Sequence, residues 1–335
     1  AGFMPARVIH LHPSRFCNLA CNHCYSSSGP GERLALDPDS ILSALRILRG
    51  EGYDVLSLAG GEPLLYGGFE AVVRGAVDLG FRVNLISNGA AVGGRLLELI
   101  AEHVSLIAIS LDGGPALHAE VRGDPRAFSW AERACDRLRD KGVHFGLAYC
   151  VSRESLADMP WAVEFAERTS AALVQFHPFA ATGRGQRLAE RLSLDEADKA
   201  RAYVIAALLE ADGGPAIQLD LVPVDAAGQR RADYRILNLV DARNERLAEL
   251  VNPLVIDERA RLLPLSYGIA SRLAIGRLGP GLEASLECYK TQGWHDLAFV
   301  LDTAFTQLGA HGERFVDWFY HVVETSRVLA EVPTA

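Results

Sequence analysis

The 335-residue chain has little cysteine and no long apolar run. Its six cysteines stand at positions 17, 21, 24, 135, 150 and 288, and half of them lie within eight residues. A small secreted scaffold would spread its disulfide cysteines more evenly, so this pattern predicts a reducing, cytoplasmic setting. No stretch approaches the about 18 apolar residues that suggest a transmembrane helix, so we expect no membrane partner.

The chain also lacks an excess of positive charge. Its 33 Lys and Arg residues face 42 Asp and Glu residues, for a formal net charge of −9. Proteins that bind nucleic acid or an anionic membrane usually carry a basic face, so we expect neither partner. Apolar residues make up 49% of the chain, which is enough to bury a large α/β domain and a smaller second unit.

Six apolar runs alternate with amphipathic stretches in the first 213 residues. The runs lie at 8–12, 55–59, 81–87, 104–111, 143–151 and 172–179. Helical patterns lie at 37–52, 69–79, 93–102, 127–141, 155–168 and 193–212. Near-continuous apolar runs are typical of parallel strands covered on both faces. Six βα units with right-handed crossovers predict a parallel sheet, open or curled into a partial barrel, with active residues at the carboxyl ends of its strands.

Two helix starts have recognisable caps. Asp37 followed by Pro38 predicts the N-cap and first position of the first helix. Ser193 and Glu196 form a capping-box pattern at the start of the last one. The two glycines at 213–214 mark a predicted domain boundary. Beyond them we expect a hairpin at 253–268, with its turn around 257–260, and two helices towards the C-terminus.

Three cysteines follow the first predicted strand in the stretch CNLACNHCY. Thiolates are soft ligands that suit zinc, copper(I) or an iron–sulfur cluster. Three thiolates on a four-iron cluster leave one iron free to bind a substrate or cofactor. The alternatives are a zinc site completed by a histidine such as His23, or small buried cysteines in a tight loop.

The second predicted strand ends in the stretch GGEP, from Gly60 to Pro63. Two glycines let a ligand approach the backbone closely, and Glu62 can accept hydrogen bonds from an amine. The alternative is an ordinary turn after a strand, with the proline starting a helix.

Together, CNLACNHCY and AGGEPLLY resemble the radical S-adenosylmethionine (radical SAM) superfamily. The resemblance implies an α/β fold with a partial (β/α)6 TIM-type barrel over residues 5–213. It implies a [4Fe–4S] cluster on Cys17, Cys21 and Cys24, whose open iron chelates the amine and carboxylate of S-adenosylmethionine. An external electron donor such as flavodoxin or ferredoxin would drive reductive cleavage to a 5′-deoxyadenosyl radical, which abstracts a substrate hydrogen atom.

The same resemblance assigns further residues to the cofactor. Gly60, Gly61 and Glu62 would hold the methionine amine, and Arg122 in HAEVRG would pair with the carboxylate, although Ala119 replaces the usual aspartate. The other residues that the resemblance places at the cofactor are His23, Ser87, Asn88, Ser110, Asp112 and His177. Each of these polar residues has a structural alternative as a cap, turn or strand-end residue.

Residues 214–335 resemble a SPASM or twitch extension that has lost its cysteines. Asn252 and Leu265 stand where the hairpin cysteines of such an extension would be, and Cys288 is the only cysteine in this region. We therefore expect a smaller, degenerate α+β extension without an auxiliary cluster. Because an S–H bond is weak, Cys288 is a candidate hydrogen donor to a carbon radical; the alternative is a half-buried cysteine in a loop. Cys135 and Cys150 are expected in the core.

The expected function is therefore that of a radical SAM enzyme that modifies a side chain of a ribosomally made peptide. One alternative is a small-metabolite substrate, such as a sugar or a tetrapyrrole. Another is a non-catalytic metal-binding scaffold or regulator. Glu62, Asp112 and Arg122 favour an enzyme, because a scaffold would not need a cofactor pocket.

Overall fold

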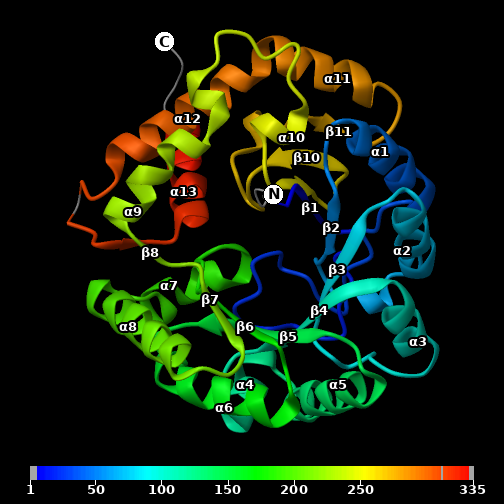
Figure 1. Cartoon of the computed structure of the whole chain (residues 1–335), viewed down its shortest axis with the longest axis vertical. Coiled ribbons are helices and arrows are strands. Elements are labelled where there is room, and N and C mark those ends of the chain that lie inside the picture. Colours follow the sequence, from blue (N-terminus) through cyan, green and yellow to red (C-terminus); the bar gives the residue numbers. More distant parts are fainter. Residues whose placement is uncertain (1–5, 311, 332–335) are drawn as a thin grey trace.

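The computed structural model describes residues 6–310 and 312–331. Residues 5, 311 and 332–335, which the expected domain ranges include, lie outside this part of the chain. The main sheet has ten strands in the order β11-β10-β9-β1-β2-β3-β4-β5-β6-β7. It curves so that helices cover its outer face (Figure 1). We call the opposite, concave face the inner face.

Strands β1 to β7 run parallel to their neighbours around the curve. They are β1 (Val8–Leu11), β2 (Val55–Leu58), β3 (Arg82–Ser87), β4 (Val104–Leu111), β5 (Phe145–Val151), β6 (Leu173–Pro178) and β7 (Ala216–Leu219). The covering helices are α1 (Pro38–Gly50), α2 (Phe69–Asp78), α3 (Gly94–His103), α5 (Ala127–Lys141), α6 (Met159–Thr169) and α8 (Glu196–Asp212). The predicted α/β partial barrel is confirmed.

Helix starts agree with the sequence in one case and differ in the other. Asp37 caps α1 by accepting a hydrogen bond from Ser40 N. At α8 the predicted Ser193 cap is wrong, because Ser193 N still donates to Ala189 O and closes the short helix α7 (Ala189–Leu192). Asp195 caps α8 instead, through a capping box with Asp198.

The predicted hairpin is present and joins the edge of the barrel. Strands β9 (Leu254–Ile256) and β10 (Arg261–Pro264) are antiparallel, and β9 also pairs in parallel with β1. Asn252, which replaces an expected cysteine, accepts a hydrogen bond from Val8 N at 2.9 Å. The sheet thus continues past residue 213 through β7 and β9, and the domain boundary there stays a prediction.

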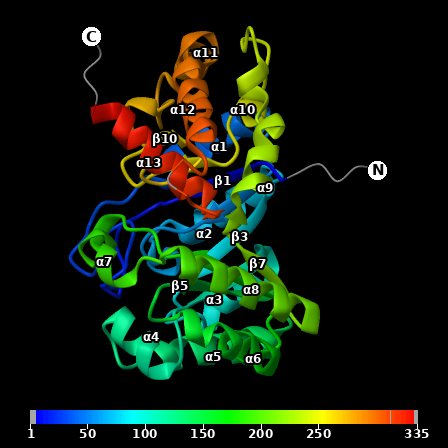
Figure 2. The same cartoon turned by 90° about the vertical axis from the view of Figure 1, so that its left-hand side faces the viewer.

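Two expected helices follow, α12 (Trp294–Gln307) and α13 (Trp318–Glu331). The sequence did not predict several shorter elements: α4 (Pro115–Arg122), α7, α9 (Val224–Gln229), α10 (Leu247–Leu250), α11 (Leu282–Cys288), β8 (Val222–Pro223), β11 (Gly276–Arg277) and β12 (Phe315–Val316). Helices α11 and α12 lie at one end of the molecule and α4 to α6 at the other (Figure 2). Within the described residues, every helix is too short or too polar to cross a membrane.

Candidate active site

The cysteine loop lies at the carboxyl ends of the strands, held by the turn after β2. Gly61 N donates to Ser14 O at 3.0 Å, and Glu62 N donates to Phe16 O at 2.9 Å. A Cβ on Gly61 would lie 2.0 Å from Phe16 O, so only glycine permits this approach. The glycine therefore admits the loop itself, and the expected contact of Gly60 and Gly61 with an amine stays a prediction.

Arg184, which sequence reasoning missed, fastens the loop from the other side. Its Nε donates to Cys21 O at 2.9 Å and its Nη2 to Ser28 O at 2.6 Å. Its backbone N donates to Cys24 O at 3.0 Å. The preceding Gly183 has φ +56° and lies so close to Tyr25 O that a Cβ would collide with it. The Gly-Arg-Gly stretch at 183–185, shortly after the sixth strand, could have indicated a close backbone contact there.

Each cysteine sulfur has a polar neighbour. Asn88 Nδ2 lies 3.8 Å from Cys17 Sγ, and Arg122 Nη1 lies 3.9 Å from Cys21 Sγ. Ser26 Oγ lies 3.4 Å from Cys24 Sγ. Hydrogen bonds of this kind stabilise metal-bound thiolates. Burial raises the pKa of Cys17 to about 12, so a bound metal is needed to favour its thiolate at neutral pH.

The arrangement of these sulfurs fits a cluster better than a single zinc ion. Zinc–sulfur bonds of about 2.3 Å in a tetrahedron place two sulfurs about 3.8 Å apart. Among the described residues, the sulfurs of Cys17, Cys21 and Cys24 do not form a set within 4.8 Å of one another. His23, the alternative fourth zinc ligand, binds Asp112 instead. We conclude that the donor set suits a larger iron–sulfur cluster.

Glu62, Ser87 and Asn88 lie in contact at the ends of β2 and β3. Glu62 is 2% exposed. Its Oε1 accepts from Ser87 Oγ at 2.9 Å, and its Oε2 accepts from Asn88 N at 2.8 Å. Burial raises the pKa of Glu62, while these hydrogen bonds oppose that shift. The carboxylate thus ties the end of β2 to the end of β3, and its contact with the cofactor amine stays a prediction.

A second group forms around Asp112, just beyond β4. His23 Nε2 lies 2.9 Å from its Oδ1, and Arg122 Nε donates to its Oδ2 at 2.5 Å. Burial alone would raise the pKa of Asp112, but Arg122 and His23 hold it well below its usual range. Ser110 lies two positions earlier on β4, on the same strand face. The assignment of these residues to the cofactor stays a prediction.

His177 lies apart from these two groups, on β6. Its Nδ1 lies 2.6 Å from Asp220 Oδ2, directly after β7. Burial alone would lower the pKa of His177, but Asp220 raises it above its ordinary value. Sequence reasoning missed Asp220 because it lies beyond the predicted boundary and outside any short motif.

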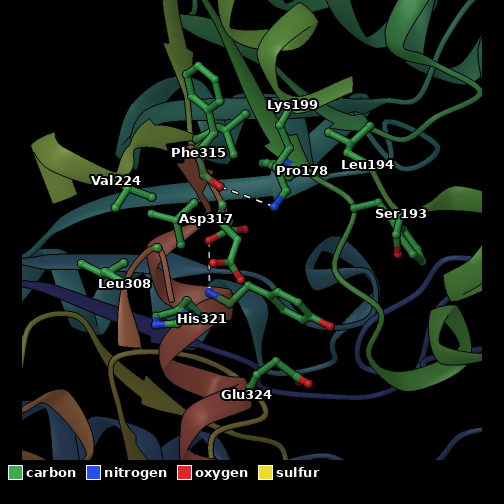
Figure 3. Close-up of a pocket in the computed structure, with 16 residues that line it drawn as sticks. Pro178, Ser193, Leu194, Lys199, Val224, Leu308, Phe315, Asp317, His321 and Glu324 are labelled. Carbon is green, nitrogen blue, oxygen red and sulfur yellow. Dashed lines mark hydrogen bonds between the residues drawn. The ribbon is translucent and has the colours of Figure 1, made fainter. Parts of the chain in front are cut away.

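A pocket of about 250 Å³ opens beside this pair, between the barrel and the C-terminal extension. Pro178 and Leu221, which directly follow His177 and Asp220, line it. Asp317 projects into it from the start of α13, and Lys199 reaches across from α8 to Phe315 O (Figure 3). Burial raises the pKa of Asp317 to about 6.

Cys288 is not brought to this site. It is exposed at the end of α11. Two residues later, Lys290 Nζ donates to Glu51 Oε1 at 2.9 Å. Glu51 lies between α1 and β2, at the amino ends of the strands, so Cys288 lies at the opposite end of the sheet from the cysteine loop. The expectation that it donates hydrogen at the site is therefore corrected.

Comparison with known proteins agrees with this geometry. A model of the Radical SAM superfamily matches residues 11–166. The chain is 25% identical over 274 residues to Fe-coproporphyrin III synthase of Methanosarcina barkeri, covering 80% of this chain and 65% of that protein. It is 30% identical over 193 residues to an AdoMet-dependent heme synthase of Oleidesulfovibrio alaskensis, covering 56% and 49%. It is 26% identical over 187 residues to the sporulation killing factor maturation protein SkfB of Bacillus subtilis, covering 55% and 45%.

These alignments span less than two thirds of each relative's own length. Among solved structures, anSMEcpe with bound AdoMet superposes with a TM-score of 0.66 at 17% identity, covering 88% of this chain and 83% of that one. At this identity the superposition shows the shared fold alone. The part of this chain that holds the cysteine loop, residues 11–166, is therefore similar to the radical SAM superfamily of enzymes.

Proposed function

We propose that this protein cleaves S-adenosylmethionine reductively and uses the resulting radical to abstract a hydrogen atom from a substrate. The observation that carries the proposal is the position of Cys17, Cys21 and Cys24 in one fastened loop beside the Glu62 and Asp112 groups. When bound, one [4Fe–4S] cluster and S-adenosylmethionine would supply the electron transfer and the radical. An external donor such as flavodoxin or ferredoxin would supply the electron.

The protein's own residues would bind and orient the cofactor. Glu62, held by Ser87 and Asn88, is a buried acceptor for an ammonium group. Arg122 would offer its outer guanidinium nitrogens to a carboxylate while Asp112 keeps its Nε engaged. Hydrogen bonds already hold the carboxylates of Glu62 and Asp112, so these two side chains would need little rearrangement when the cofactor binds.

For the substrate, we propose a side chain of a ribosomally made peptide. The name of the relative SkfB, a maturation protein for a killing factor, supports this class. The second candidate is a tetrapyrrole, which the names of the Fe-coproporphyrin III and heme synthases support. In either case the pocket beside His177 and Asp220 offers polar groups next to the inner face.

The first test is anaerobic reconstitution with iron and sulfide, followed by incubation with S-adenosylmethionine and dithionite. Mass spectrometry should detect 5′-deoxyadenosine, and a scaffold or regulator would form none. Adding Fe-coproporphyrin III then separates the substrate classes. Its consumption, with a shift of its visible absorption, would favour the tetrapyrrole, whereas a mass change in a candidate peptide substrate would favour the peptide.

A further inference from the structure

A second pocket, of about 330 Å³, lies between the cysteine loop and the C-terminal extension. Residues 25–27 of the loop and residues 182–183 after β6 line it from the barrel. The rest of its lining comes from the hairpin, the residues that follow the hairpin, and α13. Its volume lies at the lower end of the range for small-molecule sites. Glu62 and Asp112 do not line it, so it is separate from the groups expected to hold the cofactor.

Four arginines line this pocket, against one acidic residue among the described residues. The arginines are Arg15 after β1, Arg259 and Arg261 of the hairpin, and Arg327 of α13, and the acidic residue is Glu258. A guanidinium group carries five N–H donors in a planar fork, so it keeps donors for a ligand when one edge is already engaged. This lining therefore favours an anionic ligand.

Three of the arginines are held in place by acidic residues that do not line the pocket. Arg15, Arg261 and Arg327 form ion pairs with Glu32, Asp257 and Glu324 at 3.2, 2.6 and 2.8 Å, respectively. Arg327 Nε also donates to the carbonyl oxygen of Gly268 in the pocket wall, at 3.1 Å. Side chains that are already fixed lose less conformational entropy when a ligand binds, so the pocket is preorganised.

Arg259 is the lining arginine whose charge is not compensated. It is exposed in the hairpin turn, and within the described residues its guanidinium has neither an ion-pair nor a hydrogen-bond partner. The neighbouring Glu258 is 3% exposed, and both of its carboxylate oxygens lie 3.2 Å from Tyr267 OH. Because no ion pair joins Glu258 to Arg259, the charge of Arg259 remains available to a ligand.

We propose that this arginine pocket binds a carboxylate group of the substrate. The inference rests on the proposed function, and the carboxylate would be an acidic side chain of a peptide or a propionate of a tetrapyrrole. The planar fork of arginine matches the two oxygens of a carboxylate. The lining residue Ser26 has its Oγ 3.4 Å from Cys24 Sγ, so a group bound here would anchor the substrate beside the cysteine loop.

Equilibrium binding to the reconstituted holoenzyme tests the proposal without turnover. The probes are a fluorescein-labelled tetraglutamate amide, followed by fluorescence anisotropy, and Fe-coproporphyrin III, followed by its visible absorption. We expect Arg259→Gln to weaken binding about tenfold, the effect of one charge-assisted hydrogen bond. Arg46→Gln is the matched control. Arg46 on α1 is also exposed, has no ion-pair partner among the described residues, and gives the same change in net charge.

Glu258→Gln provides a variant with the opposite expected effect. It keeps an acceptor for Tyr267 OH but removes the one negative charge of the lining, so binding should tighten about threefold. A gain of this kind would not follow from misfolding.

Binding of the tetraglutamate probe alone would assign the pocket to a peptide side chain, and binding of Fe-coproporphyrin III alone would assign it to a propionate. Binding of neither probe, or equal weakening by Arg259→Gln and Arg46→Gln, would overturn the inference. These results are separate from the proposed function, which the absence of 5′-deoxyadenosine from the same preparation would overturn.

Discussion

At the scale of single residues, the site depends on buried charges that neighbouring groups compensate. Asp112 and Glu62 are both 2% exposed. Arg122 balances the first, and backbone and hydroxyl donors hold the second. A buried carboxylate without such partners would be strongly destabilising, so each partner also fixes the position of its carboxylate.

Arg184 gives the residue-scale prediction. Arg184→Ala removes two side-chain hydrogen bonds to the carbonyls of Cys21 and Ser28, so the cysteine loop should loosen. We expect the variant to bind iron less tightly and to lose about 1–3 kcal/mol of stability. Iron content after anaerobic desalting and chemical unfolding measure the two effects. The nearby Arg187→Ala is the control, and an equal loss in both variants would contradict the assigned role.

The three cysteines and Glu62 could be predicted from sequence because each lies in a short motif directly after a strand. Arg184 and Asp220 could not. Their partners are Cys21 and His177, which are 163 and 43 residues distant along the chain. Such pairs are set by the tertiary fold rather than by local spacing, and a single sequence carries little record of them.

At the scale of elements, the long strands and helices followed from their apolar periodicity. The missed strands β8, β11 and β12 have only two residues each, too short for a periodic pattern. Strand β5 shows what periodicity leaves open. The apolar pattern of β5 predicted a buried strand. Which face of the sheet holds Cys150 became clear only from the register of β5 with β4.

The turn after β2 gives a prediction about backbone approach. Gly61→Ala would force a Cβ to within 2.0 Å of Phe16 O, so the turn and the cysteine loop must separate. We expect a loss of roughly 2 kcal/mol or more and a lower iron content. Gly67→Ala is the matched control, because a Cβ there meets nothing within 4 Å. Unfolding curves that coincide for the two variants would refute this account of the turn.

The start of α13 gives a pH prediction. Burial raises the pKa of Asp317 from 3.8 to about 6 in the folded protein. A raised acid pKa costs the folded state stability as pH rises from about 4 to 6, because the unfolded chain ionises first. Asp317 Oδ1 accepts a hydrogen bond from Tyr320 N at 3.1 Å, and Asp317→Asn keeps this acceptor but removes the charge. Its stability relative to wild type should therefore rise by about 1 kcal/mol between pH 5 and pH 8.

Urea unfolding at both pH values measures this change. Asp195→Asn, at the cap of α8, is the control. The pKa of Asp195 is lowered, mainly by the hydrogen bond from Asp198 N, so folded and unfolded chains are both ionised above pH 5. The difference in stability between Asp195→Asn and wild type should therefore be the same at pH 5 and pH 8. A constant difference for Asp317→Asn as well would show that its carboxyl is not buried as described.

At the scale of the whole molecule, the extension is part of the barrel's sheet. Strand β9 pairs with β1, and Tyr53 OH donates to Val251 O at 2.7 Å. At the amino ends of the strands, Glu51 accepts from both Leu247 N and Lys290 Nζ. The hairpin was visible in the sequence, but its pairing with β1 was not, because strand pairing over 240 residues leaves no local signal.

These contacts predict that the barrel and the extension unfold together. Calorimetry of the full chain should show one transition whose calorimetric and van't Hoff enthalpies agree. Lys290→Ala removes the hydrogen bond from Lys290 Nζ to Glu51, so the midpoint of this transition should fall. The transition should stay single, because Glu51 still accepts a hydrogen bond from Leu247 N. Two separated transitions in the unsubstituted chain would mean that the extension is an independent domain.

The central claim is that Cys17, Cys21 and Cys24 together hold an iron–sulfur cluster with one open iron. Metal analysis and electron paramagnetic resonance of the oxygen-protected protein, with and without S-adenosylmethionine, test it directly. We expect about four iron and four sulfide ions per chain and a reduced-cluster signal that changes when S-adenosylmethionine binds. Both should be lost in Cys21→Ala and kept in Cys288→Ala. Zinc in place of iron, or a signal indifferent to S-adenosylmethionine, would contradict the account.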